Sequence, residues 1–225
     1  MIDIIVMEIQ NEGNLGAISR AMANFGFKNL VLVRPGCDKD SIESIKVAKH
    51  SKEVLDKIRV VDDIEDYDYL IGTTAKLGND YNIPRSPLSP EQLGEKLSSV
   101  KSKIGILIGR EGDGLTNEEI RKCDFVVTIP ASKKYPTLNI SHALAIILYE
   151  IAKKRKNVTS HIIPAKKKDK DIMNDYLCRV LDRVEFATKE KKETQKIVWR
   201  RIFGKAMMTK RETFAVMGFL KKLLK

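Results

Sequence analysis

The sequence contains few residues of the kinds that would form a metal site, a disulfide framework or a membrane span. Among its 225 residues there are only three cysteines and three histidines. Cys37, Cys123 and Cys178 are odd in number and widely scattered, and they have no metal-ligand spacing with the histidines. No run of about 18 uninterrupted apolar residues is present. We therefore expect a cytoplasmic protein with reduced thiols, no metal and no membrane partner.

The N-terminus lacks the basic segment of a secretory signal and carries an acidic residue at Asp3. Hydrophobic residues make up 43% of the chain and charged residues 32%. This balance is typical of a folded protein that buries a substantial core, and it excludes wholesale disorder and collagen-like repeats.

The basic charge is concentrated in the last third of the chain, although the formal net charge of the whole is +11. Residues 1–150 contain 19 basic and 22 acidic side chains, a net charge of −3. Residues 151–225 contain 22 basic and 8 acidic side chains, a net charge of +14. This asymmetry favours a polyanionic partner bound mainly by the C-terminal part, and a solvated lysine-rich surface is the alternative explanation.

Short apolar runs alternate with helical patterns over the first 150 residues. We expect strands over residues 2–7, 29–34, 69–74, 103–109 and 125–130. We expect helices over residues 15–25, 42–49, 90–97, 116–121 and 141–151. The runs are near-continuous in Ile, Val and Leu, as in strands covered on both faces, and Thr116 with Glu119 predicts a capping box. The pattern predicts an α/β domain with a mostly parallel sheet over residues 1–155.

The pattern changes after this domain. Residues 156–169 are basic, contain a proline and have little apolar periodicity, as in an exposed linker. Apolar residues then recur at three- and four-residue steps from Met173 to Ala187, which predicts an amphipathic helix. We expect two or three helices within residues 170–225. About 55 residues are marginal for independent folding, so these helices should pack on the main domain or on a second subunit.

Three loops that follow predicted strands carry unusual residues, and ligands of open α/β sheets bind at such loops. The first loop contains N-x-G-x-x-x-R at Asn14, Gly16 and Arg20. We expect Asn14 to cap the first helix and Arg20 to reach a phosphate near its N-terminus. A capped helix with a surface arginine is the alternative interpretation.

The second loop, GREGDGL at residues 109–115, has the spacing G-x-E-x-x-G. Its glycines permit a close approach of the main chain to a ligand, and a plain turn is the alternative. The spacing is neither that of the dinucleotide fingerprint nor that of the phosphate loop, so nucleotide-phosphate binding of those two kinds is disfavoured.

The third loop lies within residues 129–150, where an apolar helix is expected to begin with Asn139 or Ser141 as its cap. Ser141 and His142 are the residue types of a nucleophile and its base. Adjacent residues on a helix do not face each other, however, which argues against a hydrolase.

Together and in this order, the three loops resemble the motifs of the SPOUT class of RNA methyltransferases, most closely its TrmJ branch. The resemblance includes IGTTA at residues 71–75 and the segment 199–220, and it is weakest over 152–195. Members of this branch transfer a methyl group from S-adenosylmethionine to a ribose 2′-hydroxyl of tRNA. The arginine-rich continuation of IGTTA in bacterial relatives is missing, and Lys76 and Arg85 are the nearby cations.

The resemblance implies a SPOUT-type parallel sheet with a C-terminal trefoil knot, which general topology rules would not suggest. It also implies a homodimer with the active site at the subunit interface, and S-adenosylmethionine bound in the knot without a metal. The implied cofactor-binding residues are Thr73, Thr74, Ala75, Gly109, Glu111, Ile129, Pro136, Thr137, Leu138 and Asn139.

By the same resemblance, the substrate is nucleotide 32 in the tRNA anticodon loop, and the helical extension 170–225 binds the tRNA. Arg20 would grip the adjacent phosphate and stabilise the developing alkoxide, because an arginine is too weakly acidic to act as a free base. Ser141 and Asn139 would align the ribose and the cofactor, and Asn14 would hold the loop that carries Arg20. Two alternatives remain: methylation of ribosomal RNA, and a non-catalytic RNA-binding protein with the same fold.

Overall fold

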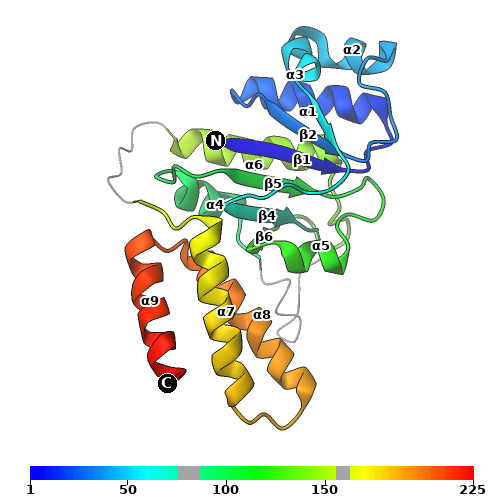
Figure 1. Ribbon diagram of the computed structural model, residues 1–225. Coiled ribbons are helices and arrows are strands. Elements are labelled where there is room, and N and C mark those ends of the chain that lie inside the picture. The colour runs from blue at the N-terminus through cyan, green and yellow to red at the C-terminus, as the bar shows by residue number, and fades with distance from the viewer. Residues whose placement is uncertain (76–86, 156–162) are drawn as a thin grey trace.

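A computed structural model describes residues 1–75, 87–155 and 163–225. Six strands form one parallel sheet in the order β3-β2-β1-β5-β4-β6, as Figure 1 shows. The strands are β1 (Ile2–Met7), β2 (Asn29–Val33), β3 (Arg59–Val61), β4 (Tyr69–Thr73), β5 (Ile104–Ile108) and β6 (Phe125–Val127). The predicted α/β class with a parallel sheet is confirmed.

Both faces of the sheet are covered, which explains the near-continuous apolar strands. The helices of this part are α1 (Glu12–Asn24), α2 (Ile42–Ala48), α3 (Lys52–Asp56), α4 (Pro90–Leu97), α5 (Asn117–Lys122) and α6 (Ile140–Lys154), with a short 3-10 turn at Lys49–Ser51. One face buries side chains of α1, α3, α4 and α6, and the other buries Tyr67, Leu115 and Ile120. The central strand β1 is buried along its whole length.

The sequence prediction missed β3 and α3 and extended several strands too far. β3 is an edge strand whose Arg59 and Val60 are exposed, so it lacks the apolar run of a buried strand. The strand expected over residues 125–130 ends at Val127. Apolar runs therefore identified the buried strands, including β6 at one edge, and failed at the exposed edge strand β3.

Two predictions of helix caps had opposite outcomes. The capping box before α5 is confirmed, because Thr116 Oγ1 accepts from the Glu119 N–H at 3.2 Å and the Glu119 carboxylate accepts from the Thr116 N–H at 2.8 Å. The prediction that Asn14 caps the first helix is wrong. Asn11 is the cap, and its side chain accepts from the Asn14 N–H at 2.8 Å. The helix therefore begins at Glu12, and the Glu111 carboxylate accepts from the Asn11 N–H at 3.1 Å.

The C-terminal helices are α7 (Lys167–Arg183), α8 (Lys189–Ala206) and α9 (Lys210–Leu223). They lie below the β4–β6 side of the sheet in Figure 1, with α7 in contact with both α8 and α9. Their own core is small and consists of Met173, Leu177, Leu181 and Leu220. The amphipathic helix expected to reach Ala187 ends at Arg183. No helix in the described ranges is long and apolar enough to cross a membrane.

Candidate active site

The segments after β4, β5 and β6 meet at one end of the sheet and enclose a hollow. Its volume is about 900 Å³, including space open to solvent. The lining residues are Thr73, Thr74, Ala75, Ile108, Gly109, Arg110, Glu111, Gly112, Asp113, Gly114, Leu115, Val127, Ile129, Pro136, Thr137, Leu138, Ile140, Ala143 and Ile147. The residues that the resemblance implied for cofactor binding therefore all line this hollow, except Asn139.

The end of β4 forms one side of the hollow and is joined to both neighbouring strands. Thr73 Oγ1 donates a hydrogen bond to the carbonyl oxygen of Leu107 at 3.1 Å. The Thr74 N–H donates to the carbonyl oxygen of Val127 at 2.9 Å. Lys76 and Arg85, the cations noted after this segment, lie outside the described residues.

The loop between β5 and α5 closes tightly on itself. Arg110 and Gly114 exchange two backbone hydrogen bonds, of 3.2 and 3.1 Å. A Cβ atom at Gly109 would lie 2.1 Å from the carbonyl carbon of Gly114, and Gly114 itself has a φ of +69°. Only glycine meets both conditions, and the loop consequently presents its main chain to the hollow.

A polar chain joins the three motifs beside the hollow. The Glu111 carboxylate accepts hydrogen bonds from the N–H groups of Gln10 and Asn11, at 3.3 and 3.1 Å, and from Asn14 Nδ2 at 3.5 Å. Asn139 Nδ2 in turn donates to Asn14 Oδ1 at 3.0 Å. Asn14, Glu111 and Asn139 are thus brought together from segments far apart in the sequence.

Of the two caps that the sequence allowed for α6, Asn139 and Ser141, the structure has Asn139. Its side-chain oxygen accepts from the Ser141 N–H at 2.9 Å and from Ser141 Oγ at 2.7 Å. Ser141 is buried, whereas His142 is exposed, so the two side chains face different surroundings. This arrangement does not form a nucleophile and base pair.

Arg20 is placed apart from these residues. It is exposed on α1 and does not line the hollow. Among the residues that the structure describes, none forms a hydrogen bond or ion pair with its guanidinium. The arginine is therefore available to a ligand or a second chain.

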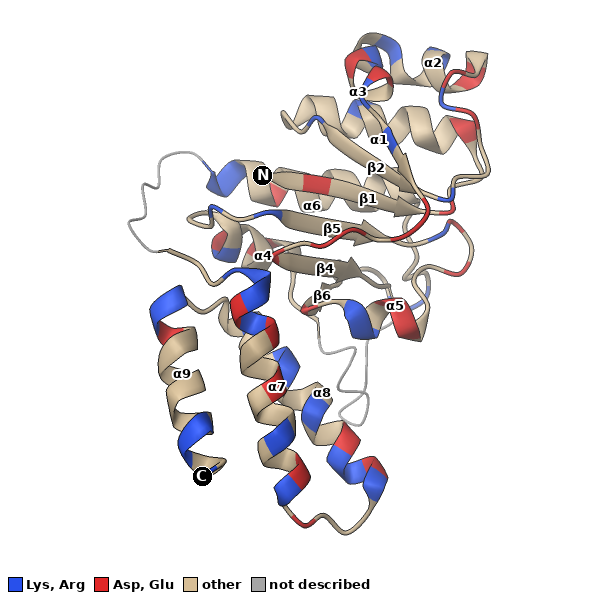
Figure 2. Cartoon of the chain, in the orientation of Figure 1, with Lys and Arg blue, Asp and Glu red and all other residues tan. Residues whose placement is uncertain are grey.

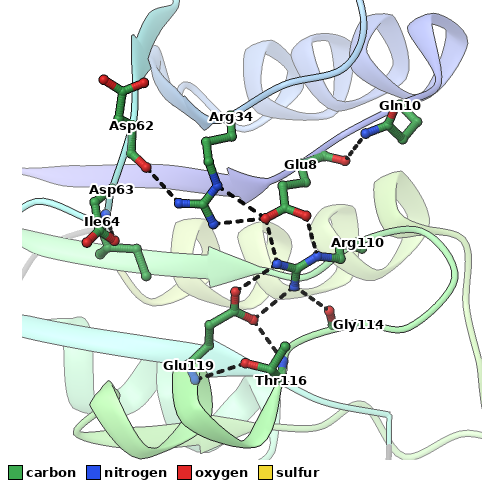
Figure 3. Close-up of polar contacts among 10 residues, drawn as sticks. All are labelled: Glu8, Gln10, Arg34, Asp62, Asp63, Ile64, Arg110, Gly114, Thr116 and Glu119. Atoms are coloured by element: carbon green, nitrogen blue, oxygen red, sulfur yellow. Dashed lines mark hydrogen bonds and ion pairs between the residues drawn. The ribbon is translucent and has the colours of Figure 1, made fainter.

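Sequence reasoning missed a cluster of charged residues behind the second loop, drawn in Figure 3. The Arg110 guanidinium lies between the carboxylates of Glu8 and Glu119, and Arg34 also contacts Glu8. Hydrogen bonds from Arg110 and Arg34 lower the pKa of Glu8 to about 2. Glu8 directly follows β1 and Arg34 directly follows β2, and the shared end of neighbouring parallel strands was the available signal.

The family of the chain follows from a comparison of its sequence with family models. The model of the SpoU rRNA Methylase family matches residues 1–149, which include every residue that lines the hollow. The chain belongs to the SpoU methylase family.

Relatives of this family member match nearly the whole chain. The tRNA (cytidine-2′-O-)-methyltransferase TrmJ of Methanocaldococcus jannaschii is 39% identical over 98% of this chain and 99% of its own. The enzyme of the same name from Sulfolobus acidocaldarius is 32% identical over 99% of this chain and 93% of its own. The crystal structure of TrmJ from Z. mobilis covers 100% of both chains with a TM-score of 0.71 and 25% identity. The similarity thus includes the C-terminal helices.

Within the described ranges, no group of three or more His, Cys, Asp or Glu side chains of this SpoU family member could hold a metal ion.

Proposed function

We propose that the chain is a tRNA 2′-O-methyltransferase that uses S-adenosylmethionine and modifies nucleotide 32 of the anticodon loop. The observation that carries the proposal is the meeting of the three motifs at one hollow, in a chain whose near-full-length relatives are named tRNA 2′-O-methyltransferases. The position within the tRNA comes from the resemblance of the motifs to the TrmJ branch. A tRNA substrate favours action in the cytoplasm.

The lining of the hollow suits the chemistry of S-adenosylmethionine. Ile129 and Leu138 offer apolar contacts for an adenine ring, and the main chain of residues 109–115 offers hydrogen-bonding groups. When bound, S-adenosylmethionine supplies an already activated methyl group, and this transfer chemistry requires no metal. The protein then has to orient the two reactants and to stabilise the ribose oxygen as it loses its proton.

Arg20 is the residue proposed to act on the substrate. Its guanidinium binds the phosphate beside the target ribose and stabilises the developing alkoxide, because an arginine stays protonated and does not serve as a free base. Asn139 and Ser141 align the ribose and the methyl donor, with Ser141 Oγ already bonded to Asn139. Asn14 holds the N-terminal part of α1 against Asn139 and Glu111.

A homodimer accounts for the separation of Arg20 from the hollow of its own chain. α1 packs against α6, and the rings of Phe25 and Tyr149 join them with centroids 6.1 Å apart. Ile146 and Tyr149 on α6 are 39% and 49% exposed, which is apolar surface that a second copy would cover. We propose that the active site is completed at this interface.

The trefoil knot and the division of the chain belong to the same proposal. β6 pairs with β4 and not with β5, the strand before it in the sequence, so the chain passes over β4 to reach the edge of the sheet. The knot itself comes from the resemblance of the motifs to the SPOUT class. Residues 1–155 would be the methyltransferase domain, followed by a basic linker and a tRNA-binding extension, whose helices carry many Lys and Arg residues, as Figure 2 shows. The boundary expected between residues 169 and 170 falls inside α7, so we place the start of the extension at Lys167.

The direct test is to incubate the protein with labelled S-adenosylmethionine and a tRNA transcript, and to map the methylated nucleotide. We expect a 2′-O-methyl group at nucleotide 32. Arg20→Ala should reduce turnover by about 10²–10³-fold without changing the affinity for S-adenosylmethionine. Lys46→Ala, at an exposed lysine of α2, is the matched control and should leave turnover unchanged.

The description of the family names ribosomal RNA, so a ribosomal RNA fragment is the second substrate in the same assay. Methylation of that fragment with none of the tRNA would overturn the proposed substrate. Binding of S-adenosylmethionine and RNA without any methyl transfer would favour the non-catalytic alternative.

A further inference from the structure

The charged cluster behind the glycine loop has a geometry that no other ion pair of the described residues repeats. Arg110 Nε and Nη2 each donate to a different oxygen of Glu8 at 2.8 Å. Arg110 Nη1 and Nη2 each donate to a different oxygen of Glu119 at 3.0 Å. One guanidinium therefore forms two forked pairs, and Figure 3 shows it between the two carboxylates. Forked pairs of this kind fix orientation as well as distance.

Each of the two carboxylates is held by a further element of the fold. Arg34 donates to Glu8 at 2.8 Å through Nη2 and to the carbonyl oxygen of Asp62 at 2.7 Å through Nη1. Glu119 accepts from the Thr116 N–H in the capping box of α5. The cluster consequently ties the loop to the ends of β1 and β2 and to the start of α5.

The backbone at the ends of β1 and β2 is shaped to deliver these side chains. Glu8 and Arg34 have φ values of 44° and 46°, in the left-handed region that residues with a Cβ rarely adopt. Unfavourable backbone conformations of this kind persist where the surrounding contacts hold them. Glu8 and Arg34 are in direct contact, so the contacts of the cluster hold two unfavourable backbone conformations side by side.

Glu111, the residue after Arg110, holds the other side of the glycine loop. Glu111 accepts from the backbone of Gln10 and Asn11, whereas the Arg110 side chain bonds to Glu8 and Glu119. The main chain of residues 109–115 lines the hollow and is the part proposed to contact the methyl donor. Its conformation thus depends on contacts made on both sides.

We propose that Arg110 is a positioning residue that sets the shape of the donor-binding loop through Glu8 and Glu119. The inference rests on the proposed function for the identity of the ligand, and on the geometry alone for the rigidity of the loop. Arg110 does not act on the substrate, because its guanidinium is occupied by two carboxylates and by the carbonyl oxygen of Gly114.

Arg110→Lys tests this role, because a lysine keeps the charge but cannot form two forked pairs. In the ligand-free protein, we expect hydrogen exchange at the amides of residues 111–115 to become at least about tenfold faster. For S-adenosylmethionine, we expect Kd and KM to rise about tenfold or more, with kcat at saturating donor nearly unchanged. Glu8→Gln and Glu119→Gln should change the same quantities in the same direction.

Arg59→Lys is the matched control. Arg59 also links two carboxylates, those of Asp3 and Glu65, and it has no contact with the hollow. This variant should leave both the exchange of residues 111–115 and the donor affinity unchanged, even if it lowers the melting temperature.

The outcomes separate this proposal from the proposed function. If Arg110→Lys lowers only the melting temperature and leaves exchange and donor affinity as in the wild type, the positioning role is wrong. If Arg110→Lys accelerates exchange in the loop but the wild-type protein does not bind S-adenosylmethionine, the positioning role of Arg110 is supported and the proposed function is wrong. If Arg59→Lys accelerates hydrogen exchange at residues 111–115 equally, the positioning role of Arg110 is also wrong, because the effect would then come from a general loss of stability.

Discussion

The sheet domain and the three C-terminal helices are stabilised in different ways. The sheet carries two apolar clusters, one on each face, and all of their buried residues come before α7, with Met207 of the C-terminal part packed against one of them. The C-terminal helices share a cluster in which only Met173, Leu177, Leu181 and Leu220 are buried. The domain thus contains a complete core, whereas the helices rely on their contact with it.

That contact is made largely by buried cations. Lys170 is 8% exposed, its Nζ is 3.0 Å from Asp124 Oδ1, and it lies 3.8 Å above the centre of the Tyr69 ring. Arg201 is 5% exposed and donates to the carbonyl oxygen of Ile120 at 2.6 Å. Gly204 allows α8 to approach Asp124, because a Cβ there would lie 2.5 Å from the Asp124 carbonyl oxygen. The helices are thus docked by specific polar contacts together with the packing of Met207 against the sheet cluster.

The largest effect should come from removing the helices. A chain that ends after Arg155 loses most of the +14 charge but keeps every residue that lines the hollow. We expect it to bind S-adenosylmethionine normally and to lose tRNA affinity by about 10²–10³-fold, because affinity follows the number of phosphates that cations neutralise. Filter binding across a salt series measures this. Full-length protein should show the steeper salt dependence, and equal slopes in the two proteins would contradict a tRNA-gripping role.

Breaking the buried ion pair between Lys170 and Asp124 should have the largest effect on the stability of the fold. Asp124→Ala leaves Lys170 buried without its carboxylate and also removes the acceptor of the Leu70 N–H at 2.9 Å. We expect a loss of about 3–5 kcal/mol in the free energy of unfolding, measured in urea. The double variant Asp124→Ala with Lys170→Met is the control and should lose less, because it leaves no buried charge. A double variant as unstable as the single one would show that the charge is not the cause.

Replacing Arg201 tests how α8 is docked, and we expect a smaller loss in the free energy of unfolding. Arg201→Met keeps much of the packing and removes the hydrogen bond to Ile120, for an expected loss of about 1.5–3 kcal/mol. Proteolysis should then cut within α8 faster than within the sheet domain. Arg200→Met is the matched control, because Arg200 is exposed and donates to the carbonyl oxygen of Lys122 at 3.3 Å. Equal cleavage of both variants would mean that burial of Arg201 contributes nothing.

The same contrast explains what the sequence could predict. Apolar runs identified the covered strands, and local spacing identified the Thr116 capping box, because both signals lie within a few residues. The cap of α1 was assigned to Asn14 although the capping contact is local, because the Asn11 side chain accepts from the Asn14 N–H only three residues further on. Lys170 and Arg201 resemble the solvated cations around them, so their burial has no local signal.

The candidate site divides in the same manner. The three loops were singled out because loops that follow the strands of a parallel sheet converge at one edge, whereas the individual residues of the hollow came from the resemblance to the SPOUT class. The Glu8–Arg110–Glu119 cluster was missed because its members come from three segments, and pairing between charged residues depends on the fold. The association of Arg20 with a second chain stays a prediction, because one chain contains only one side of such an interface.

The smallest effect is expected at two capping boxes of the same type, one in each region. Thr209 and Glu212 begin α9, as Thr116 and Glu119 begin α5. Thr209→Ala should lower the free energy of unfolding by about 1 kcal/mol, and Thr116→Ala by a similar amount. Only Thr116→Ala should also weaken binding of S-adenosylmethionine, because Glu119 holds Arg110 and α9 lies outside the hollow.

The capping box of α9 should be sensitive to pH through the carboxylate of Glu212. The backbone N–H of Thr209, followed by its hydroxyl, lowers the pKa of Glu212 below the ordinary 4.5. Because the folded-state pKa is the lower one, the box stabilises α9 above pH 4.5, and this contribution is lost as the pH falls below that value. The melting temperatures of wild type and Glu212→Gln should therefore differ at pH 7 and converge as the pH falls below 4.5. A difference that persists unchanged in acid would mean that the carboxylate's charge does not stabilise the start of α9.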